Sequence, residues 1–177
     1  QFADGDPARS LNPWNPAHTP GGSSTGSAVS VAARMVPAAL GSQTVGSVLR
    51  PAAYNGIVGL KPTYGRISKY GVVEYAHSFD HVGILARTVK DVAILLSVMA
   101  GADEKDITAS REPVPNYISE IGQKIESPRI GVLRGYFTDY SSKDTLENLN
   151  SVINRLRDAG ADIQDVEPQV NFGEMFD

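Results

Sequence analysis

The chain has 177 residues, of which 41% are hydrophobic and 20% are charged, a composition that is ordinary for a globular protein and argues against disorder. Sixteen basic residues face twenty acidic ones, so the formal net charge is −4, and no basic run suits a nucleic-acid surface. Cysteine is absent, which excludes thiol catalysis, thiolate metal sites and disulfides, and fits a reducing compartment. We therefore expect a cytoplasmic protein with a single domain over residues 1–177.

Membrane and metal sites find no support in the sequence. The longest apolar run, 92–100, is far too short to span a bilayer. No spacing of histidine and acidic residues suits a metal ion, and no motif for an organic cofactor is complete. We expect neither membrane association nor a cofactor or metal.

The elements of the first half alternate between helix and strand. Residues 1–20 are rich in proline, which predicts an extended, turn-rich approach. Small and apolar residues then predict a helix over 26–35, ended by Pro37, and a short buried strand over 38–44. A second helix over 47–54 tolerates Pro51 in or near its first turn, and a strand over 57–61 follows.

The second half continues the same alternation. A strand over 81–87 precedes a helix that begins with a capping box of Thr88 and Asp91 and stops before Gly101. Residues 102–128 are polar and indicate a connector. A strand over 129–133, a long helix capped by Ser141 and Asp144, and a strand over 162–166 complete the chain. This alternation predicts an α/β fold class.

The stretch 21–27 is rich in glycine and serine and allows several interpretations. A flexible linker is one. A phosphate-binding loop is set aside because Ser27 stands where such a loop requires lysine. A nucleophile elbow centred on Ser24, with His77 or His81 as a partner, needs a buried strand before it, whereas proline-rich coil precedes.

A fourth interpretation joins this turn to a second one at 41–47. Each turn presents a serine, and the intervening helix and strand would let the two hydroxyls meet. A serine is a weak nucleophile until a neighbour accepts its proton, and a second hydroxyl can both accept and donate one. We therefore predict that Ser47 is a nucleophile and Ser23 its proton relay.

These residues also carry a resemblance to a known family. The motifs, read along the chain, are 21–28 (GGSSTGSA), 41–47 (GSQTVGS), 51–53 (PAA), 56–63 (GIVGLKPT) and 78–80 (SFD). Together they resemble the amidase signature family over residues 1–101, with 129–167 similar in general layout. The resemblance implies a mixed sheet flanked by helices and a Ser–Ser–Lys triad that hydrolyses the C–N bond of a small-molecule amide.

The resemblance also implies roles for individual residues. Ser47 falls at the nucleophile, and Ser23 at the bridging serine, which the family holds after a cis peptide bond. The oxyanion hole would consist of the backbone N–H groups of Thr44, Val45, Gly46 and Ser47. A turn of successive N–H groups at a helix start forms a concave anion site.

Three residues depart from the family's usual turn. Gln43, Val45 and Leu49 replace aspartate, glycine and arginine. Glutamine can still form hydrogen bonds. A β-branched residue strongly disfavours positive φ, so we expect ordinary backbone angles at Val45.

The triad lysine is the largest absence, because residues 1–22 contain no lysine. Lys61, before Pro62, matches a structural position of the family, and Lys69 is similarly unattractive as a base. Asp80 and His81, just before a strand, suit hydrogen-bonding roles. We therefore expect an interior, central part of a larger amidase domain, and an isolated chain without activity.

Two alternatives stay open beside a serine amidase. One is the glutaminase-type A-subunit of an amidotransferase, although the changes at Gln43 and Leu49 count against it. The other is a non-catalytic remnant of the fold. A homodimer is also left open.

Overall fold

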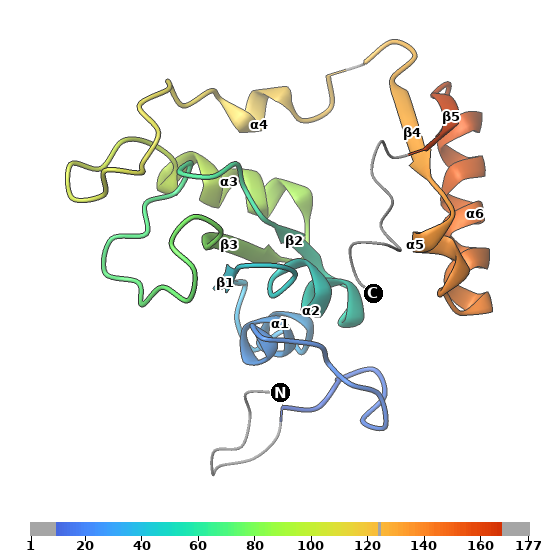
Figure 1. Ribbon diagram of the computed structural model, residues 1–177, viewed down its shortest axis with the longest axis horizontal. Helices are drawn as coiled ribbons and strands as arrows, with labels where there is room; N and C mark the ends of the chain where they lie inside the picture. Colours follow the sequence, from blue (N-terminus) through green and yellow to red (C-terminus); the bar gives the residue numbers. More distant parts are fainter. Residues whose placement is uncertain (1–9, 124, 168–177) are drawn as a thin grey trace. The chain divides into compact units, whose positions relative to one another are not determined.

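The computed structural model describes residues 10–123 and 125–167 (Figure 1). The chain separates into two compact units, Gln1–Gly122 and Gln123–Asp177, while the expectation of one domain stays a prediction. Within the described residues, no helix is both long enough and apolar enough to cross a membrane.

The first unit holds most of the regular structure. Its elements in chain order are α1 (Thr25–Ala32), β1 (Ala38–Gln43), α2 (Leu49–Tyr54), β2 (Val58–Leu60), β3 (His81–Ala86), α3 (Val89–Met99) and α4 (Tyr117–Glu120). The predicted elements up to residue 101 are all present, and only the short α4, inside the expected connector, was not predicted.

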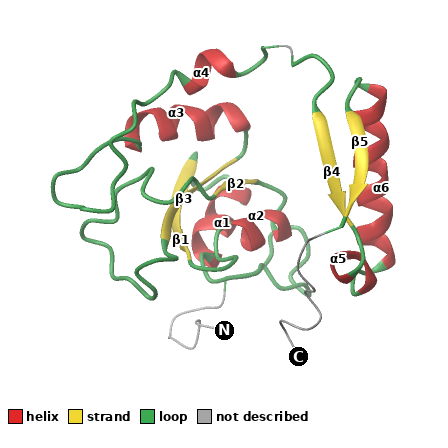
Figure 2. Ribbon diagram, turned by 45° about the horizontal axis from the view of Figure 1, so that its top comes forward, coloured by secondary structure: helices red, strands yellow, loops and turns green. Residues whose placement is uncertain are grey.

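The three strands of this unit form an antiparallel sheet in the order β1-β3-β2. Gly41 of β1 lies opposite Gly83 of β3, and Leu60 of β2 lies opposite Ile84. β3 is the central strand, and like those of any strand its successive side chains point to opposite faces of the sheet. Figure 2 shows this sheet with the helices around it.

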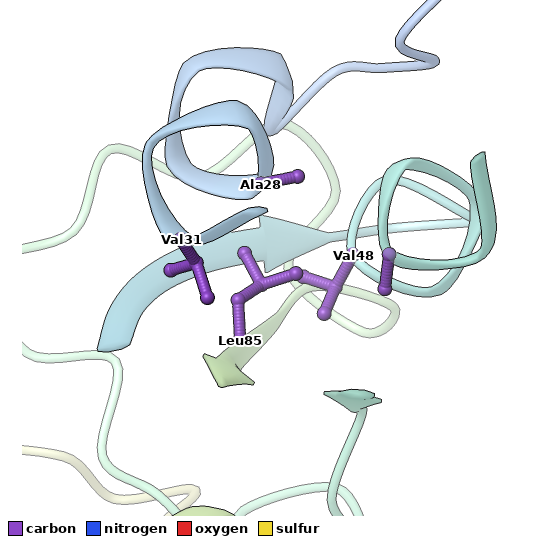
Figure 3. Close-up of a cluster of buried hydrophobic side chains, with 5 residues drawn as sticks. Ala28, Val31, Val48 and Leu85 are labelled. Carbon is purple, nitrogen blue, oxygen red and sulfur yellow. The ribbon is translucent and has the colours of Figure 1, made fainter. Parts of the chain in front are cut away.

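Each face of the sheet has its own hydrophobic cluster. Leu85 packs with Ala28 and Val31 of α1 and with Val48, which precedes α2 (Figure 3). Val82, Ile84 and Ala86 point to the other face, where they pack with Ile67 and with side chains of α3 such as Val92. The sheet is therefore a middle layer, with α1 and α2 on one side and α3 on the other.

Val48 lies unusually close to the sheet. An added Cβ at Gly83 would lie 2.9 Å from Val48 Cγ2, and one at Gly41 would lie 3.2 Å from the same atom. The absence of side chains at the paired residues Gly41 and Gly83 thus lets Val48 pack directly on the sheet. Because Val48 follows Ser47, this close contact fixes the distance between the 43–47 turn and the sheet.

Helix boundaries differ in detail from those expected. α1 ends at Ala32 because Arg34 adopts a left-handed φ of 61°, so the chain turns before it reaches Pro37. Thr88 caps α3 as predicted, accepting a hydrogen bond from the Asp91 N–H. That helix ends because Ala100 is extended and forms a β-bridge with Ile67.

The second unit is a β-α-β arrangement. Its elements are β4 (Arg129–Leu133), α5 (Tyr136–Asp139), α6 (Lys143–Asp158) and β5 (Asp162–Val166). β4 and β5 pair in parallel, with Arg129 opposite Asp162. The connection between parallel strands runs through α6, as such a pairing requires. The α/β class is confirmed, although the described strands form two separate sheets.

The cap of α6 was predicted one residue too early. Ser142, not Ser141, is the N-cap, and its hydroxyl accepts from the Thr145 N–H. The Ser141 hydroxyl donates instead to the carbonyl of Phe137, in the unpredicted α5. Adjacent serines are equally able to cap a helix, and here the Ser141 hydroxyl is already bonded to α5, so Ser142 caps α6.

Candidate active site

The glycine- and serine-rich turn at 21–24 is fixed to the second turn and to α2. The Ser24 N–H donates to the carbonyl of Ser47 at 3.0 Å, and Arg50 Nε donates to the carbonyl of Gly22 at 3.0 Å. A flexible linker would have neither contact, so that interpretation is wrong. The Gly22–Ser23 peptide bond is cis, as the resemblance implies.

The nucleophile elbow is not supported either. Ser24 precedes α1, but no strand lies between residues 10 and 24, where the elbow requires one. The Ser24 hydroxyl donates to the carbonyl of Ser42 at 3.3 Å. Ser24 therefore holds the two turns together, through both its main chain and its side chain.

The second turn is shaped by Gln43, which is only 2% exposed. Its Oε1 accepts from the N–H groups of Val48 and Leu49 at 2.8 and 2.9 Å. Its Nε2 donates to the carbonyl of Val45 at 3.0 Å. Val45 is 90% exposed and is not among the described residues with positive φ, so its predicted ordinary backbone is confirmed.

The N–H groups of Thr44, Val45, Gly46 and Ser47 are the notable feature of this turn. None of the four donates a hydrogen bond to any part of the chain that the structure describes. Successive unpaired N–H groups before a helix form a concave site with a positive potential. The arrangement can therefore hold an anion, including the oxyanion of an acyl-transfer intermediate.

The two predicted serines lie on adjoining turns. Ser47 is half-buried and Ser23 is exposed. Within residues 10–123 and 125–167, neither hydroxyl has a hydrogen-bond partner, and the two do not bond to each other. The main-chain bond from Ser24 to Ser47 nevertheless brings Ser47 next to the residue that follows Ser23. Their catalytic roles stay predictions.

Asp80 fastens the second turn from the side of β3. Its Oδ1 accepts from the Thr44 hydroxyl at 2.5 Å, and its Oδ2 accepts from the N–H groups of Tyr75 and Ala76 at 2.5 and 2.9 Å. Burial acts to raise the pKa of Asp80, but these hydrogen bonds outweigh it and lower the pKa. The predicted hydrogen-bonding role of Asp80 is confirmed.

The two lysines near the site in sequence have other partners. Lys61 Nζ contacts the Pro62 carbonyl at 2.8 Å and Nε2 of His81 at 3.2 Å. Lys69 is buried, pairs with Glu74 at 2.8 Å and donates to the Tyr64 hydroxyl at 3.1 Å. These contacts agree with a structural role for both, and neither lysine is seen to contact Ser23 or Ser47.

No group of three or more histidine and acidic side chains able to hold a metal ion occurs among the residues that the structure describes.

The sequence did not predict one residue of the site, Arg50. It contacts Gly22, 28 positions away, and no local pattern signals so distant a contact. Gln43 was noted only as a substitution, and its three hydrogen bonds depend on how the chain folds back.

Comparison with known proteins places these observations in a family. The family model described as Amidase matches residues 8–172. The A-subunit of glutamyl-tRNA(Gln) amidotransferase from Neisseria meningitidis is 48% identical over 155 residues, which is 88% of this chain and 32% of that protein. The chain therefore spans about a third of the length of the curated relatives it matches.

Solved structures show the same similarity. The A-subunit of glutamyl-tRNA(Gln) amidotransferase from Thermotoga maritima matches with a TM-score of 0.84 and 35% identity, over 94% of this chain and 42% of that one. Native peptide amidase from Stenotrophomonas maltophilia matches with a TM-score of 0.80 and 39% identity, over 89% of this chain and 33% of that one. Since the family model covers nearly the whole sequence, this chain belongs to the Amidase family.

Proposed function

We propose that this chain carries the nucleophile and the oxyanion-binding turn of an enzyme that hydrolyses the C–N bond of a carboxamide. The observation that carries this proposal is the run of four unclaimed N–H groups at Thr44–Ser47, beside a hydroxyl that has no partner among the described residues. Relatives named as a peptide amidase and as part of an amidotransferase support the reaction class.

The first half of the reaction forms an acyl-enzyme. Ser47 Oγ attacks the amide carbon while its proton passes to Ser23, whose own proton moves to a base. The carbonyl oxygen becomes an oxyanion and is stabilised by the N–H groups of the turn, where each donor is worth about 3 kcal/mol. The C–N bond then breaks as the nitrogen takes a proton back through Ser23 and leaves as ammonia or an amine.

The second half releases the acid. Water attacks the ester carbon, transfers a proton through the same relay, and displaces Ser47 as the carboxylate product forms. Ser23 suits the relay because a hydroxyl can donate and accept at once.

The base is expected to be a lysine upstream of Ser23, but residues 1–22 contain none, and Lys61 and Lys69 have other partners. We accordingly propose that the 177-residue chain alone has little or no activity. A small-molecule amide is the proposed substrate, and the cytoplasmic location stays a prediction.

A second candidate function is the ammonia-producing component of an amidotransferase. The 48% identity to proteins named as the A-subunit of glutamyl-tRNA(Gln) amidotransferase favours it, and it would give the protein other subunits as partners. The replacements at Gln43 and Leu49 count against it. Glutamine hydrolysis that rises when partner subunits are added would identify this function, whereas hydrolysis of amides without any partner would identify a free-standing amidase.

The decisive test uses the complete protein that contains this chain. Ammonia release from a panel of carboxamides, and covalent labelling by a fluorophosphonate, are both expected to disappear in Ser47→Ala. Labelling that persists in Ser47→Ala would contradict the assigned nucleophile. A folded protein that neither hydrolyses amides nor accepts the label would support a non-catalytic remnant of the fold.

A further inference from the structure

The side chain of Arg50 joins the two turns that carry the candidate serines. A Cβ added at Gly46 would lie 3.8 Å from Arg50 Cβ, so the side chain begins beside the 44–47 turn. Its Nε donates to the Gly22 carbonyl at 3.0 Å, so the guanidinium lies beside the residue that precedes Ser23. A fixed positive charge is therefore held at the edge of the site in which the amide carbon would be attacked.

The bond to Gly22 uses only part of this guanidinium. Nε has a single N–H, and the other donors of the group are on Nη1 and Nη2. Among the described residues, neither Nη atom of Arg50 has an acceptor, and no ion pair includes this side chain. Arg66, in contrast, uses its Nη1 and Nη2 on the carbonyls of Glu112 and Pro113. Arg50 is thus oriented by one nitrogen and keeps two donor nitrogens for a ligand.

The chemistry of these donors favours a carboxylate. Two parallel N–H groups on a planar cation match the two oxygens of a carboxylate. Because the Gly22 carbonyl already orients the group, less conformational freedom is lost when an anion binds. The family's usual turn has its arginine at position 49, where this chain has Leu49, so the resemblance assigns no role to Arg50.

We propose that Arg50 binds a carboxylate of the substrate and so selects amides that carry a carboxylate a few bonds from the scissile carbonyl. This inference rests on the proposed function. The Gly46 N–H, expected to face the oxyanion, and the guanidinium are separated by no more than the reach of one arginine side chain. A short carbon chain can span that separation. Arg50 takes no part in bond breaking, so its contribution is to substrate binding.

The principal test uses the complete protein and pairs of primary amides in which a carboxylate replaces a methyl group, such as succinamate and butanamide. In the wild type we expect kcat/KM for succinamate to exceed that for butanamide at least about 50-fold. In Arg50→Gln this ratio should fall to about threefold or less, chiefly because KM for succinamate rises. The control is Arg111→Gln, at another exposed arginine of the first unit, which should keep the ratio within about twofold of the wild type.

The ratio separates recognition of the carboxylate from support of the 21–24 turn. Loss of the bond from Nε to the Gly22 carbonyl affects both amides equally, so it cancels in the ratio. An Arg50→Gln variant that loses activity equally on both amides keeps the wild-type ratio and would overturn the proposal. A wild type without preference for succinamate would overturn it as well.

Arg50→Lys and the wild type decide the question if Arg50→Gln does not fold. Lysine keeps the charge but lacks the planar pair of donors, so the preference for succinamate should fall at least about threefold. Succinate should also inhibit the wild type at least about tenfold more strongly than butanoate. An unchanged preference in Arg50→Lys, or equal inhibition by the two acids, would contradict the assigned carboxylate site.

Ser47→Ala, measured with the same amides, keeps the two proposals apart. If Ser47→Ala hydrolyses them like the wild type, the proposed function itself fails. If Ser47→Ala is inactive and the wild type hydrolyses succinamate and butanamide equally well, only the role of Arg50 fails.

Discussion

Two loops of the first unit differ in whether their polar groups form hydrogen bonds with the rest of the protein. In the segment 102–117 many of them do: Arg66 donates to the Tyr117 hydroxyl and to the carbonyls of Glu112 and Pro113. Asp106 accepts from the Lys69 and Thr108 N–H groups at 2.7 and 2.8 Å. The 44–47 turn, in contrast, donates none of its N–H groups to the described chain.

The difference suggests a criterion that separates a connecting loop from the proposed site. A loop that only connects elements gains stability by pairing its polar groups, and nearly all buried ones in folded proteins are paired. We propose that a turn whose N–H groups stay unclaimed, while its other polar groups are firmly held, is arranged for a ligand. The side chains of Gln43 and Asp80 do that holding here.

The largest expected effect is at the 44–47 turn. Ser47→Ala should lower amide hydrolysis by at least about 1,000-fold, since removing a nucleophile leaves only binding and the oxyanion hole. The melting temperature should barely change, because the hydroxyl has no hydrogen-bond partner among the described residues. Ser151→Ala, on the exposed face of α6, is the control, and equal losses in both variants would contradict the assignment.

The second largest effect is expected where Val48, next to the 44–47 turn, packs against Gly83 of the sheet. Gly83→Ala would place a Cβ 2.7 Å from the Leu60 carbonyl oxygen and 2.9 Å from Val48, so we expect a loss of about 2–3 kcal/mol in the free energy of unfolding. Denaturant titration measures it. Gly26→Ala, inside α1, would place a Cβ in ordinary contact with Ser10 Oγ at 3.9 Å and should instead add about 0.5–1 kcal/mol; the absence of this contrast would contradict the close approach.

A substitution that releases the segment 102–117 should lower the stability of the protein rather than its activity. Arg66→Ala removes three hydrogen bonds to residues 112–117 and should cost about 2 kcal/mol in the free energy of unfolding. The activity per folded molecule should change less than about threefold. An activity loss like that of Ser47→Ala would break the distinction between the two loops.

The smallest expected effect concerns Asp106. Hydrogen bonds from the Lys69 N–H and the Thr108 hydroxyl lower its pKa to about 2. The ionised form is thus favoured by folding, so its contribution is present above an unfolded pKa of about 3.9 and is lost as the pH falls through about 2. After discounting for partial exposure, Asp106→Asn should cost about 1 kcal/mol at pH 7.

That difference should shrink between about pH 4 and pH 2, as unfolding curves at several pH values would show. Glu104→Gln, at an exposed position of the same loop, is the control and should shift stability by less than about 0.5 kcal/mol. A loss from Asp106→Asn that stays constant down to pH 2 would contradict the role of its carboxylate.

Local patterns predicted most of the fold. The capping box at Thr88 and the apolar spacing after it predicted α3, and the glycines after Met99 and Asp158 agree with the observed helix ends. The cap of α6 was misplaced by one residue because Ser141 and Ser142 offer the same chemistry. Contacts between residues far apart in sequence were not predicted, because a local pattern contains no information about them.

The site shows the same division. The order of the motifs predicted Ser23, Ser47 and the 41–47 turn as the candidate site, and the ordinary backbone at Val45 was predicted from its β-branching. The bond from Arg50 to Gly22 and the pairing of Thr44 with Asp80 depend on the antiparallel return of β3 beside β1. Such contacts become visible only when the register of the strands is known.

We propose that the N–H groups of the 44–47 turn bind the oxyanion next to Ser47. A crystal structure of the complete protein with a fluorophosphonate adduct tests it most directly. We predict phosphorus bonded to Ser47 Oγ, with its oxygen about 2.7–3.1 Å from the backbone nitrogens of at least two residues among 44–47. An adduct on another residue, or an oxygen turned to solvent with those nitrogens unbound, would contradict the account.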